Sequence, residues 1–219
     1  MENQVLIVDS QEAINCCLKY FLDKLEQVPI VATATTIKKA YQIAFTSSTT
    51  TSDFIIAFMD LQLPHYKEKQ LHNGEDLAKL FRVKAPNTKI VFVLSDYTNK
   101  DLYRISKRIQ PEGIIDKMDI REETLLEHIE SIASGNQYLS PIVEDKLIKY
   151  SQNMHLFNKI ELQIVHLIQQ GITTKNIPRH LNITLSAVNK RKQKIKRLLE
   201  IEQGNDEDII RECKKRCIL

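Results

Sequence analysis

Residues 54–60 read Phe-Ile-Ile-Ala-Phe-Met-Asp, six apolar residues followed directly by a carboxylate. A continuous apolar run of this length is typical of a strand buried on both faces, as in a parallel sheet covered by helices. Similar runs lie at 5–8, 90–94 and 113–115, and a weaker one lies at 29–32. These runs predict a five-stranded parallel sheet.

Stretches with the apolar spacing of helices separate the runs, at 14–25, 77–81, 102–109 and 125–132. Their apolar residues recur at intervals of three and four, which places them on one face of each helix. Thr98 with Asp101, and Asp119 with Glu122, are placed as N-caps followed by an acid at the third position. Strands that alternate with helices predict one doubly wound α/β domain, because parallel strands need a crossover connection.

Composition and motifs exclude several classes of function. The 219 residues include only 5 glycines and contain neither G-x-G-x-x-G nor G-x-x-x-x-G-K-[ST], which excludes the usual nucleotide-binding loops. Apolar runs reach only about six residues, whereas a membrane span needs roughly 20. The polar residues 1–4 are not typical of a secretory signal, and the four cysteines suit free thiols. We therefore expect a cytoplasmic protein without membrane contact.

Charge is distributed unevenly along the chain. Residues 1–154 carry 18 Lys and Arg against 21 Asp and Glu, whereas residues 155–203 carry 9 against 3. The tail, 204–219, is balanced at 4 against 4. A mildly acidic front and a compact basic segment predict a regulatory or catalytic module joined to a module that binds a polyanion.

Four polar side chains follow the predicted strands. Asp9 closes the first strand, Asp60 the third, Ser95 the fourth and Lys117 the fifth. The carboxyl ends of parallel strands meet at one edge of a sheet, so we expect these side chains to line one crevice. Two carboxylates can hold a hard cation, and a carboxylate can act as a nucleophile toward a phosphoryl group. A single aspartate at a strand end is more often a cap, but four such residues at one edge favour a phosphoryl site.

On these motifs, residues 1–134 resemble the receiver domain of bacterial two-component response regulators. The matching segments are Val-Leu-Ile-Val-Asp9, Phe-Met-Asp60-Leu-Gln-Leu-Pro64, Val-Leu-Ser95 and Gly113-Ile-Ile-Asp-Lys117. The resemblance implies that Asp60 is the phosphoacceptor and that Asp9 binds Mg²⁺ directly or through water. It also implies that Gln62 offers a backbone carbonyl to the metal and that Ser95 and Lys117 bind the phosphoryl group. The implied partner is a sensor histidine kinase or a phosphotransfer protein.

The chain departs from this family at three places. Ser10 stands where the family usually has a second acid, which predicts weak Mg²⁺ binding. Ile114 stands where the family has an aromatic switch residue, so that switch cannot operate. Nine residues lie between Pro64 and Gly74, more than in the short loop of the family. This insertion is either a partner-reading surface or a solvated loop.

The basic segment has the pattern of a small helical domain. Asn158 and Glu161 predict a capped helix that ends at Gly171, and a short helix over 173–180 follows it. Thr184 predicts the cap of a basic helix with one apolar face and one polar face. The apolar face carries Leu185, Val188, Ile195 and Leu199, and the polar face carries Ser186, Asn189, Lys190, Gln193 and Lys196. Helix, short helix, tight turn and basic helix form the helix-turn-helix plan.

Residues 157–203 resemble the helix-turn-helix output domain of the NarL/LuxR family. Matching positions include Phe157, Glu161, Gly171, Ile177, Thr184, Val188 and Ile195. The resemblance implies that Asn189, Lys190 and Gln193 face bases of double-stranded DNA, and that phosphates are contacted by Lys175, Thr184, Arg191, Lys192 and Lys196. Two departures are Ala187, where threonine is usual, and Pro178, which predicts that its helix is kinked or starts late.

The tail predicts one more helix, with Asn205 as its cap. Ile209, Ile210, Cys213 and Cys217 form its apolar stripe. Two thiols without a nearby histidine do not predict a zinc site. We expect a structural or dimer-forming helix, and hence a homodimer.

These observations predict an α/β doubly wound five-stranded parallel sheet followed by an all-α helix-turn-helix domain. The predicted division is a receiver domain at 1–134, a linker at 135–156 and a DNA-binding domain with a C-terminal helix at 157–219. The predicted function is that of a transcriptional response regulator, not an enzyme, controlled by phosphorylation of Asp60.

Three alternatives remain open. The first is a regulator of the same architecture that binds DNA without phosphorylation, favoured by Ser10 and Ile114. The second is a Mg²⁺-dependent aspartyl-phosphate phosphohydrolase, disfavoured because Gln62 stands where such enzymes usually carry a second aspartate. The third is an interaction module whose basic helix binds an acidic protein.

Overall fold

The chain forms two compact units in the computed structural model, which describes residues 4–25, 30–46, 54–153 and 155–219. One unit comprises Met1–Tyr97 and Arg104–Glu144, and the other comprises Thr98–Tyr103 and Asp145–Leu219. Over the described ranges, every helix is too short or too polar to cross a bilayer.

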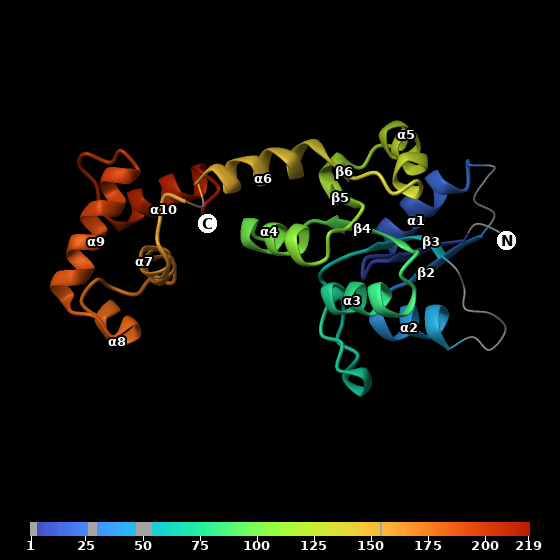
Figure 1. The fold of residues 1–219 in the computed structure, drawn as a ribbon, viewed down its shortest axis with the longest axis horizontal. Coiled ribbons are helices and arrows are strands. Elements are labelled where there is room, and N and C mark those ends of the chain that lie inside the picture. Colours follow the sequence, from blue (N-terminus) through green and yellow to red (C-terminus); the bar gives the residue numbers. More distant parts are fainter. Residues whose placement is uncertain (1–3, 26–29, 47–53, 154) are drawn as a thin grey trace. The chain divides into compact units, whose positions relative to one another are not determined.

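A parallel sheet forms the centre of the first unit (Figure 1). Its strands are β1 (Gln4–Val8), β2 (Ile30–Ala34), β3 (Phe54–Met59), β4 (Lys89–Leu94), β5 (Gly113–Asp116) and β6 (Tyr138–Leu139). They lie in the order β2-β1-β3-β4-β5-β6, and each neighbouring pair is parallel. The predicted doubly wound parallel sheet is therefore confirmed. Pro29, which opens the weakest predicted run, lies outside the described residues.

Helices cover both faces of this sheet and explain why its strands read as continuous apolar runs. They are α1 (Glu12–Leu22), α2 (Ile37–Phe45), α3 (Gly74–Lys84), α4 (Asn99–Arg108) and α5 (Glu122–Ala133). α1 and α5 lie on one face, and α2 and α3 lie on the other (Figure 1). Leu18 of α1 and Ile129 of α5 pack in one buried cluster with Val5, Phe58 and Val91 of the strands. Burial of such side chains supplies the main favourable free energy of the unit.

The sheet has one strand more than the five predicted. β6 pairs with β5 through Gly113 opposite Tyr138 and Ile114 opposite Leu139. β6 lies within 135–156, the segment predicted as a linker. Two residues are too few to show a periodicity, so the apolar pattern could not reveal this strand.

The second unit contains helices with the predicted helix-turn-helix plan. They are α6 (Pro141–Asn153), which begins in the first unit, α7 (Lys159–Gln169), α8 (Ile177–Leu181), α9 (Leu185–Leu198) and α10 (Asp206–Lys215). Asn158 and Glu161 form a capping box on α7, and Asn205 and Asp208 form one on α10. Ile164, Val165, Val188, Ile195 and Ile209 meet in the buried core.

One predicted helix start is confirmed and one is wrong. The short helix α8 starts late, as Pro178 predicts: it begins at Ile177 rather than at 173, and the proline lies in its first turn, where a missing N–H costs little. Asp119 does not cap α5, which begins after Arg121 without a side-chain cap. A 3-10 turn, η2 (Lys117–Asp119), separates β5 from α5 and displaces Asp119 from that position. Thr98 does exchange hydrogen bonds with Asp101 at the start of α4, as predicted.

Candidate functional site

A lysine and two aspartates meet at the carboxyl edge of the sheet. The Lys117 Nζ lies 2.7 Å from Oδ2 of Asp9 and 2.9 Å from Oδ2 of Asp60. Asp9 and Asp60 are 1% and 4% exposed, and the Lys117 side chain is 8% exposed. The structure thus brings together three of the four residues predicted at this edge, and it places the fourth, Ser95, at an exposed position directly after β4.

Backbone groups hold the other oxygen of each carboxylate. The N–H of Gln11 donates to Oδ1 of Asp9 at 2.9 Å, and the N–H of Gln62 donates to Oδ1 of Asp60 at 3.2 Å. The N–H of Asp60 donates to the carbonyl of Val8 at 2.8 Å, which ties the end of β3 to the end of β1. Each carboxylate is therefore oriented by a backbone donor on one oxygen and by Lys117 on the other.

Burial and charge act in opposite directions on this cluster. Burial raises the pKa of Asp9 above its ordinary value, and the neighbouring Asp60 raises it further, although Lys117 and Gln11 oppose both effects. Burial would lower the pKa of Lys117, but its hydrogen bonds and charge interactions with both aspartates outweigh that effect and raise it. Lys117 therefore stays protonated at neutral pH, and one ammonium faces two carboxylates.

The start of α3 packs directly against the backbone of Asp60. A Cβ atom on Gly74 would lie 1.9 Å from the carbonyl oxygen of Asp60, so only glycine fits here. The N–H of Gly74 donates to the carbonyl of Leu61 at 3.0 Å, and Asn73 caps α3 through the N–H of Asp76. The nine-residue insertion therefore leaves and rejoins the fold beside Asp60.

The insertion has a defined local structure. Tyr66 and Leu71 pair as an antiparallel bridge, around a 3-10 turn, η1 (Lys67–Lys69). The ring of Tyr66 contacts that of Tyr41 in α2 edge-on, with centroids 5.7 Å apart. The insertion is thus held against α2, while η1 itself is exposed.

The two other departures from the receiver pattern have clear positions. Ile114 is fully buried within β5, so the place of an aromatic switch residue is filled by a core side chain. Ser10 is exposed beside Asp9. Gln62 directs its side-chain amide to the carbonyl of Asp96 at 3.4 Å, where it cannot act as an acid.

A second candidate site is the polar face of α9. Asn189, Lys190 and Gln193 are exposed, whereas Val188 and Ile195 on the opposite face are buried in the core. Thr184 accepts a hydrogen bond from the N–H of Ala187 at 3.1 Å, which caps the helix as predicted. Lys175 is exposed and Arg191 is half-buried. An exposed helix face with amide and ammonium groups matches the side chains that read base edges and phosphates.

Three residues of α9 differ from the predicted arrangement. Lys192 forms an ion pair with Asp206 of α10 and donates to Oγ1 of Thr174 at 2.6 Å, so its side chain is largely covered. Lys196 donates to the carbonyl of Gly204 at 2.5 Å. Leu185, predicted on the packed face, is 41% exposed because it opens the helix.

Two basic residues that were not predicted to contact DNA lie beside this face. Lys194 and Arg197 line a pocket of about 410 Å³ together with Lys190, Arg191 and Asn158. Lys194 lies 2.8 Å from the fully buried carboxylate of Glu161, and this ion pair holds the pKa of Glu161 below its ordinary value against the effect of burial. Their spacing with Lys190, at 190, 194 and 197, places these cations on one helix face, and this spacing could have predicted them from the sequence.

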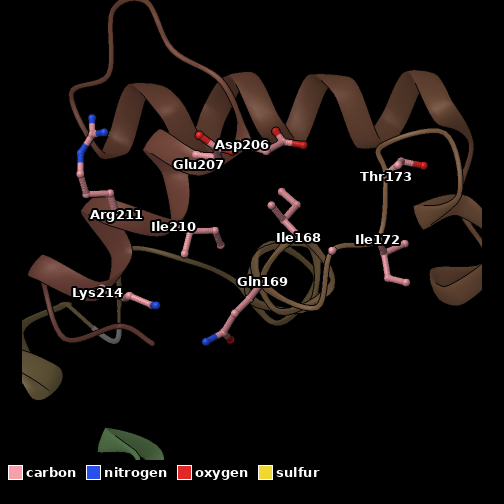
Figure 2. Close-up of a pocket in the computed structure, with 10 residues that line it drawn as sticks. Ile168, Gln169, Ile172, Thr173, Asp206, Glu207, Ile210, Arg211 and Lys214 are labelled. Carbon is pink, nitrogen blue, oxygen red and sulfur yellow. The ribbon is translucent and has the colours of Figure 1, made fainter.

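A groove between α7 and α10 is the third feature of note (Figure 2). It has a volume of about 640 Å³, and its lining includes Ile168, Ile172 and Ile210. Along α10, Asp206 and Glu207 lie at the start of the groove, and Arg211 and Lys214 lie further along it (Figure 2). The helix therefore presents an apolar stripe with acidic and basic ends.

Solved structures share this architecture over nearly the whole chain. RcsB from Salmonella enterica serovar Typhimurium, bound to a promoter in the presence of the phosphomimetic BeF3⁻, matches with a TM-score of 0.66 at 17% identity over 100% of both chains. A structure of two RcsB dimers bound to two parallel DNAs matches with a TM-score of 0.69 at 18% identity over 98% of both chains. ChrA, the response regulator of a heme-sensing two-component system, matches with a TM-score of 0.50 at 17% identity over 100% of both chains.

The chain has the fold of a response regulator. No protein family model matches the sequence, and no curated protein matches it either. The fold implied by the two sequence resemblances is therefore confirmed by structure. The first compact unit is called the receiver unit below, and the second is called the helix-turn-helix unit.

Proposed function

We propose that this response-regulator fold serves a DNA-binding regulator whose activity is controlled by phosphorylation of Asp60. The observation that carries the proposal is the buried cluster in the receiver unit, where Lys117 bridges Asp9 and Asp60 at 2.7 and 2.9 Å. An ion pair that served stability alone would need one carboxylate, and a second buried carboxylate costs desolvation and like-charge repulsion. Such an arrangement suits a site that binds a cation together with a phosphoryl group.

The chemistry assigned to Asp60 is acyl-phosphate formation. One carboxylate oxygen attacks the phosphorus of the donor, an O–P bond forms, and the bond from phosphorus to the donor nitrogen or oxygen breaks. The donor leaves with that electron pair. Lys117 and the hydroxyl of Ser95 then bind phosphoryl oxygens, and the buried walls of the crevice limit access of water. The donor partner is a sensor histidine kinase or a phosphotransfer protein.

Mg²⁺ fits the donor set of this crevice. The Asp9 and Asp60 carboxylates and the backbone carbonyl of Gln62 are hard oxygen ligands of the type that Mg²⁺ prefers. One ammonium faces two carboxylates, so a further cation would be favourable in this crevice. When bound, Mg²⁺ would supply positive charge that screens the carboxylates and the incoming phosphoryl oxygens. Ser10 contributes a hydroxyl rather than a carboxylate, so we propose weak binding.

The helix-turn-helix unit is assigned the binding of double-stranded DNA through α9. Asn189, Lys190 and Gln193 are exposed in the manner that base contacts require. Lys175, Thr184 and Arg191, together with Lys194 and Arg197, are proposed to supply phosphate contacts. Lys192 and Lys196 are proposed to contribute less, because the ammonium of Lys192 is paired with Asp206 and that of Lys196 donates to the carbonyl of Gly204.

We propose a homodimer, which the charge order of α10 supports. If two copies of this helix pair antiparallel, Glu207 of one copy can meet Arg211 or Lys214 of the other, and the apolar stripe around Ile210 is covered. Two DNA-binding units related by a twofold axis would read two half-sites.

A second candidate function is a regulator of this architecture that binds DNA without phosphorylation. It is favoured by Ile114, which is fully buried where an aromatic switch residue would stand, and by the neutral Ser10 beside Asp9. The phosphohydrolase alternative is not adopted, because the side chain of Gln62 binds a backbone carbonyl and carries no acidic group.

The decisive experiment is phosphoprotein electrophoresis after incubation with acetyl phosphate and Mg²⁺. The wild-type chain should be labelled and Asp60→Asn should not. Asp23→Asn, which alters an exposed carboxylate of the receiver unit, is the matched control and should be labelled normally. Labelling of Asp60→Asn would refute the site, and DNA binding that is equal with and without acetyl phosphate would favour the second candidate function.

A further inference from the structure

The turn that carries Lys117 is hydrogen-bonded on both sides of that residue. Asp116, which is 4% exposed, accepts a hydrogen bond from the N–H of Met118 through Oδ1 at 3.0 Å and so caps η2. Its Oδ2 accepts a hydrogen bond from the hydroxyl of Tyr97 at 2.5 Å. Tyr97 lies two residues after Ser95, so this bond joins the two segments that supply the proposed phosphoryl contacts.

The same turn is bonded to the start of α6. The N–H of Asp116 donates to Oγ of Ser140 at 3.0 Å, and the N–H of Ser140 donates to the carbonyl of Ile114 at 3.0 Å. Ser140 is fully buried and directly precedes α6.

Asp119, on the other side of Lys117, binds the first turn of α6. Pro141, the first residue of α6, has no N–H, and the N–H of Ile142 donates to Oδ2 of Asp119 at 2.8 Å. The N–H of Glu144 then donates to the carbonyl of Ser140 at 2.9 Å, which is the first ordinary helical hydrogen bond. A carboxylate at this end of a helix is stabilising because of the N-terminal N–H groups and the helix dipole.

The four residues Asp116–Asp119 therefore contact both the carboxylate cluster and the start of α6. Through Lys117 they hold the carboxylates of Asp9 and Asp60, and through Asp116 and Asp119 they hold Ser140 and Ile142. A phosphoryl group on Asp60 would add three oxygens beyond the carboxylate. Lys117 would bind them by moving away from its present position between the two aspartates.

We infer that Asp116–Asp119 is a latch that couples the state of Asp60 to the first turn of α6. When Lys117 moves to a phosphoryl group, the η2 turn moves with it and the cap from Asp119 to Ile142 loosens. The device needs no aromatic side chain at position 114. It rests on the proposed phosphorylation of Asp60, since that reaction is what displaces Lys117.

Amide hydrogen exchange of the full-length chain tests this latch, with Mg²⁺ and beryllofluoride as the phosphoryl mimic. ¹⁹F NMR of bound fluoride shows in the same samples whether Asp60 has taken up the mimic. In the wild-type chain, we expect beryllofluoride to speed exchange at 142–144 by about fivefold, the factor that loss of a helix cap produces. Asp119→Ala should show this faster exchange without beryllofluoride, should bind the mimic normally, and should show no further increase.

Two more variants make the result specific. Asp119→Asn keeps an acceptor oxygen without the charge and should give a smaller increase than Asp119→Ala. Asp208→Ala removes the matching carboxylate cap of α10 and should leave the response at 142–144 intact. If bound fluoride is observed and exchange at 142–144 is unchanged, the latch is refuted while the phosphorylation site stands. If no bound fluoride is observed, the proposed function fails and the latch fails with it.

Discussion

Each unit of this chain buries a carboxylate against a lysine, and the two arrangements differ in the exposure of the lysine and in the number of carboxylates it faces. In the helix-turn-helix unit, Lys194 leaves 52% of its side chain exposed while it neutralises the single buried carboxylate of Glu161. In the receiver unit, Lys117 is itself buried and faces both Asp9 and Asp60. The first arrangement lowers the pKa of its acid, whereas the second leaves the pKa of Asp9 raised.

The difference separates a structural ion pair, Lys194 with Glu161, from the cluster around Lys117 that we propose as the phosphorylation site. Glu161 also caps α7, so its carboxylate is both hydrogen-bonded and neutralised within the fold. In the crevice, two carboxylates share one ammonium, and the charge balance improves only when a further cation enters. The predictions below test this contrast.

The largest expected effect comes from removing each lysine. Lys117→Met leaves two buried carboxylates without their cation and should lower the free energy of unfolding by about 3–5 kcal/mol at pH 7. Lys194→Met leaves one buried carboxylate that still accepts the N–H of Asn158, and should cost about 1–3 kcal/mol. Urea unfolding followed by circular dichroism measures both losses. Equal losses would contradict the distinction between the two pairs.

Loss of DNA affinity should be larger for an exposed lysine of α9 than for a lysine that is paired within the chain. Lys190→Ala removes an exposed ammonium and should weaken binding to a specific site by about 1–3 kcal/mol. Lys192→Ala should leave DNA affinity nearly unchanged and instead lower the free energy of unfolding by about 1 kcal/mol, because Lys192 is paired with Asp206. Fluorescence anisotropy with specific and random duplexes measures the affinities. A larger loss of affinity for Lys192→Ala than for Lys190→Ala would reverse the assignment.

The pH dependence of stability should have opposite signs at the two carboxylates. Glu161 has a lowered pKa in the folded chain, so its stabilisation is present above its ordinary value of 4.5 and is lost as the pH falls through the folded value. Asp9 has a raised pKa, so its contribution is favourable below 3.8 and is lost as the pH rises through the folded value. Unfolding of Glu161→Gln and Asp9→Asn between pH 3 and 7 tests this. The destabilisation by Glu161→Gln should shrink toward pH 3, and a constant difference would contradict the prediction.

The smallest effect concerns Mg²⁺. Ser10→Asp restores a third carboxylate to the crevice and should lower the Kd for Mg²⁺ by about fivefold, because the added Coulomb attraction is partly screened by water and salt. Glu12→Gln is the control for another acid that already supplies this charge. Titration calorimetry compares the variants. Equal affinities of the wild-type chain and Ser10→Asp would show that the serine at position 10 does not weaken Mg²⁺ binding.

Patterns of local chemistry were sufficient for most of the architecture. Continuous apolar runs of three to six residues predicted β1, β3, β4 and β5, since a strand buried on both faces disfavours polar residues. Caps at Asn158, Thr184 and Asn205 were predicted because a side-chain oxygen serves its own neighbouring N–H groups. The placement of Asp9, Asp60 and Lys117 at one edge followed from strand direction alone.

Other features depend on contacts between distant residues, which no local pattern records. β6 is two residues long and exists because Gly113 and Ile114 offer it a free edge. Asp119 was predicted to cap α5 and caps α6 instead, because η2 carries it away from one helix and toward the other. Lys192 matches the spacing of a DNA-facing residue, yet Asp206 on another helix draws it inward.

The sequence by itself determined the strands from β1 to β5, the helix-turn-helix plan and the set of groups at the carboxyl edge, because periodicity and capping act over a few residues. Only the tertiary structure decided which of those groups are neutralised, which helix Asp119 caps and which lysines remain exposed. Those outcomes depend on burial and on the distance between charges that lie far apart in the chain, and both exist only once the chain has folded.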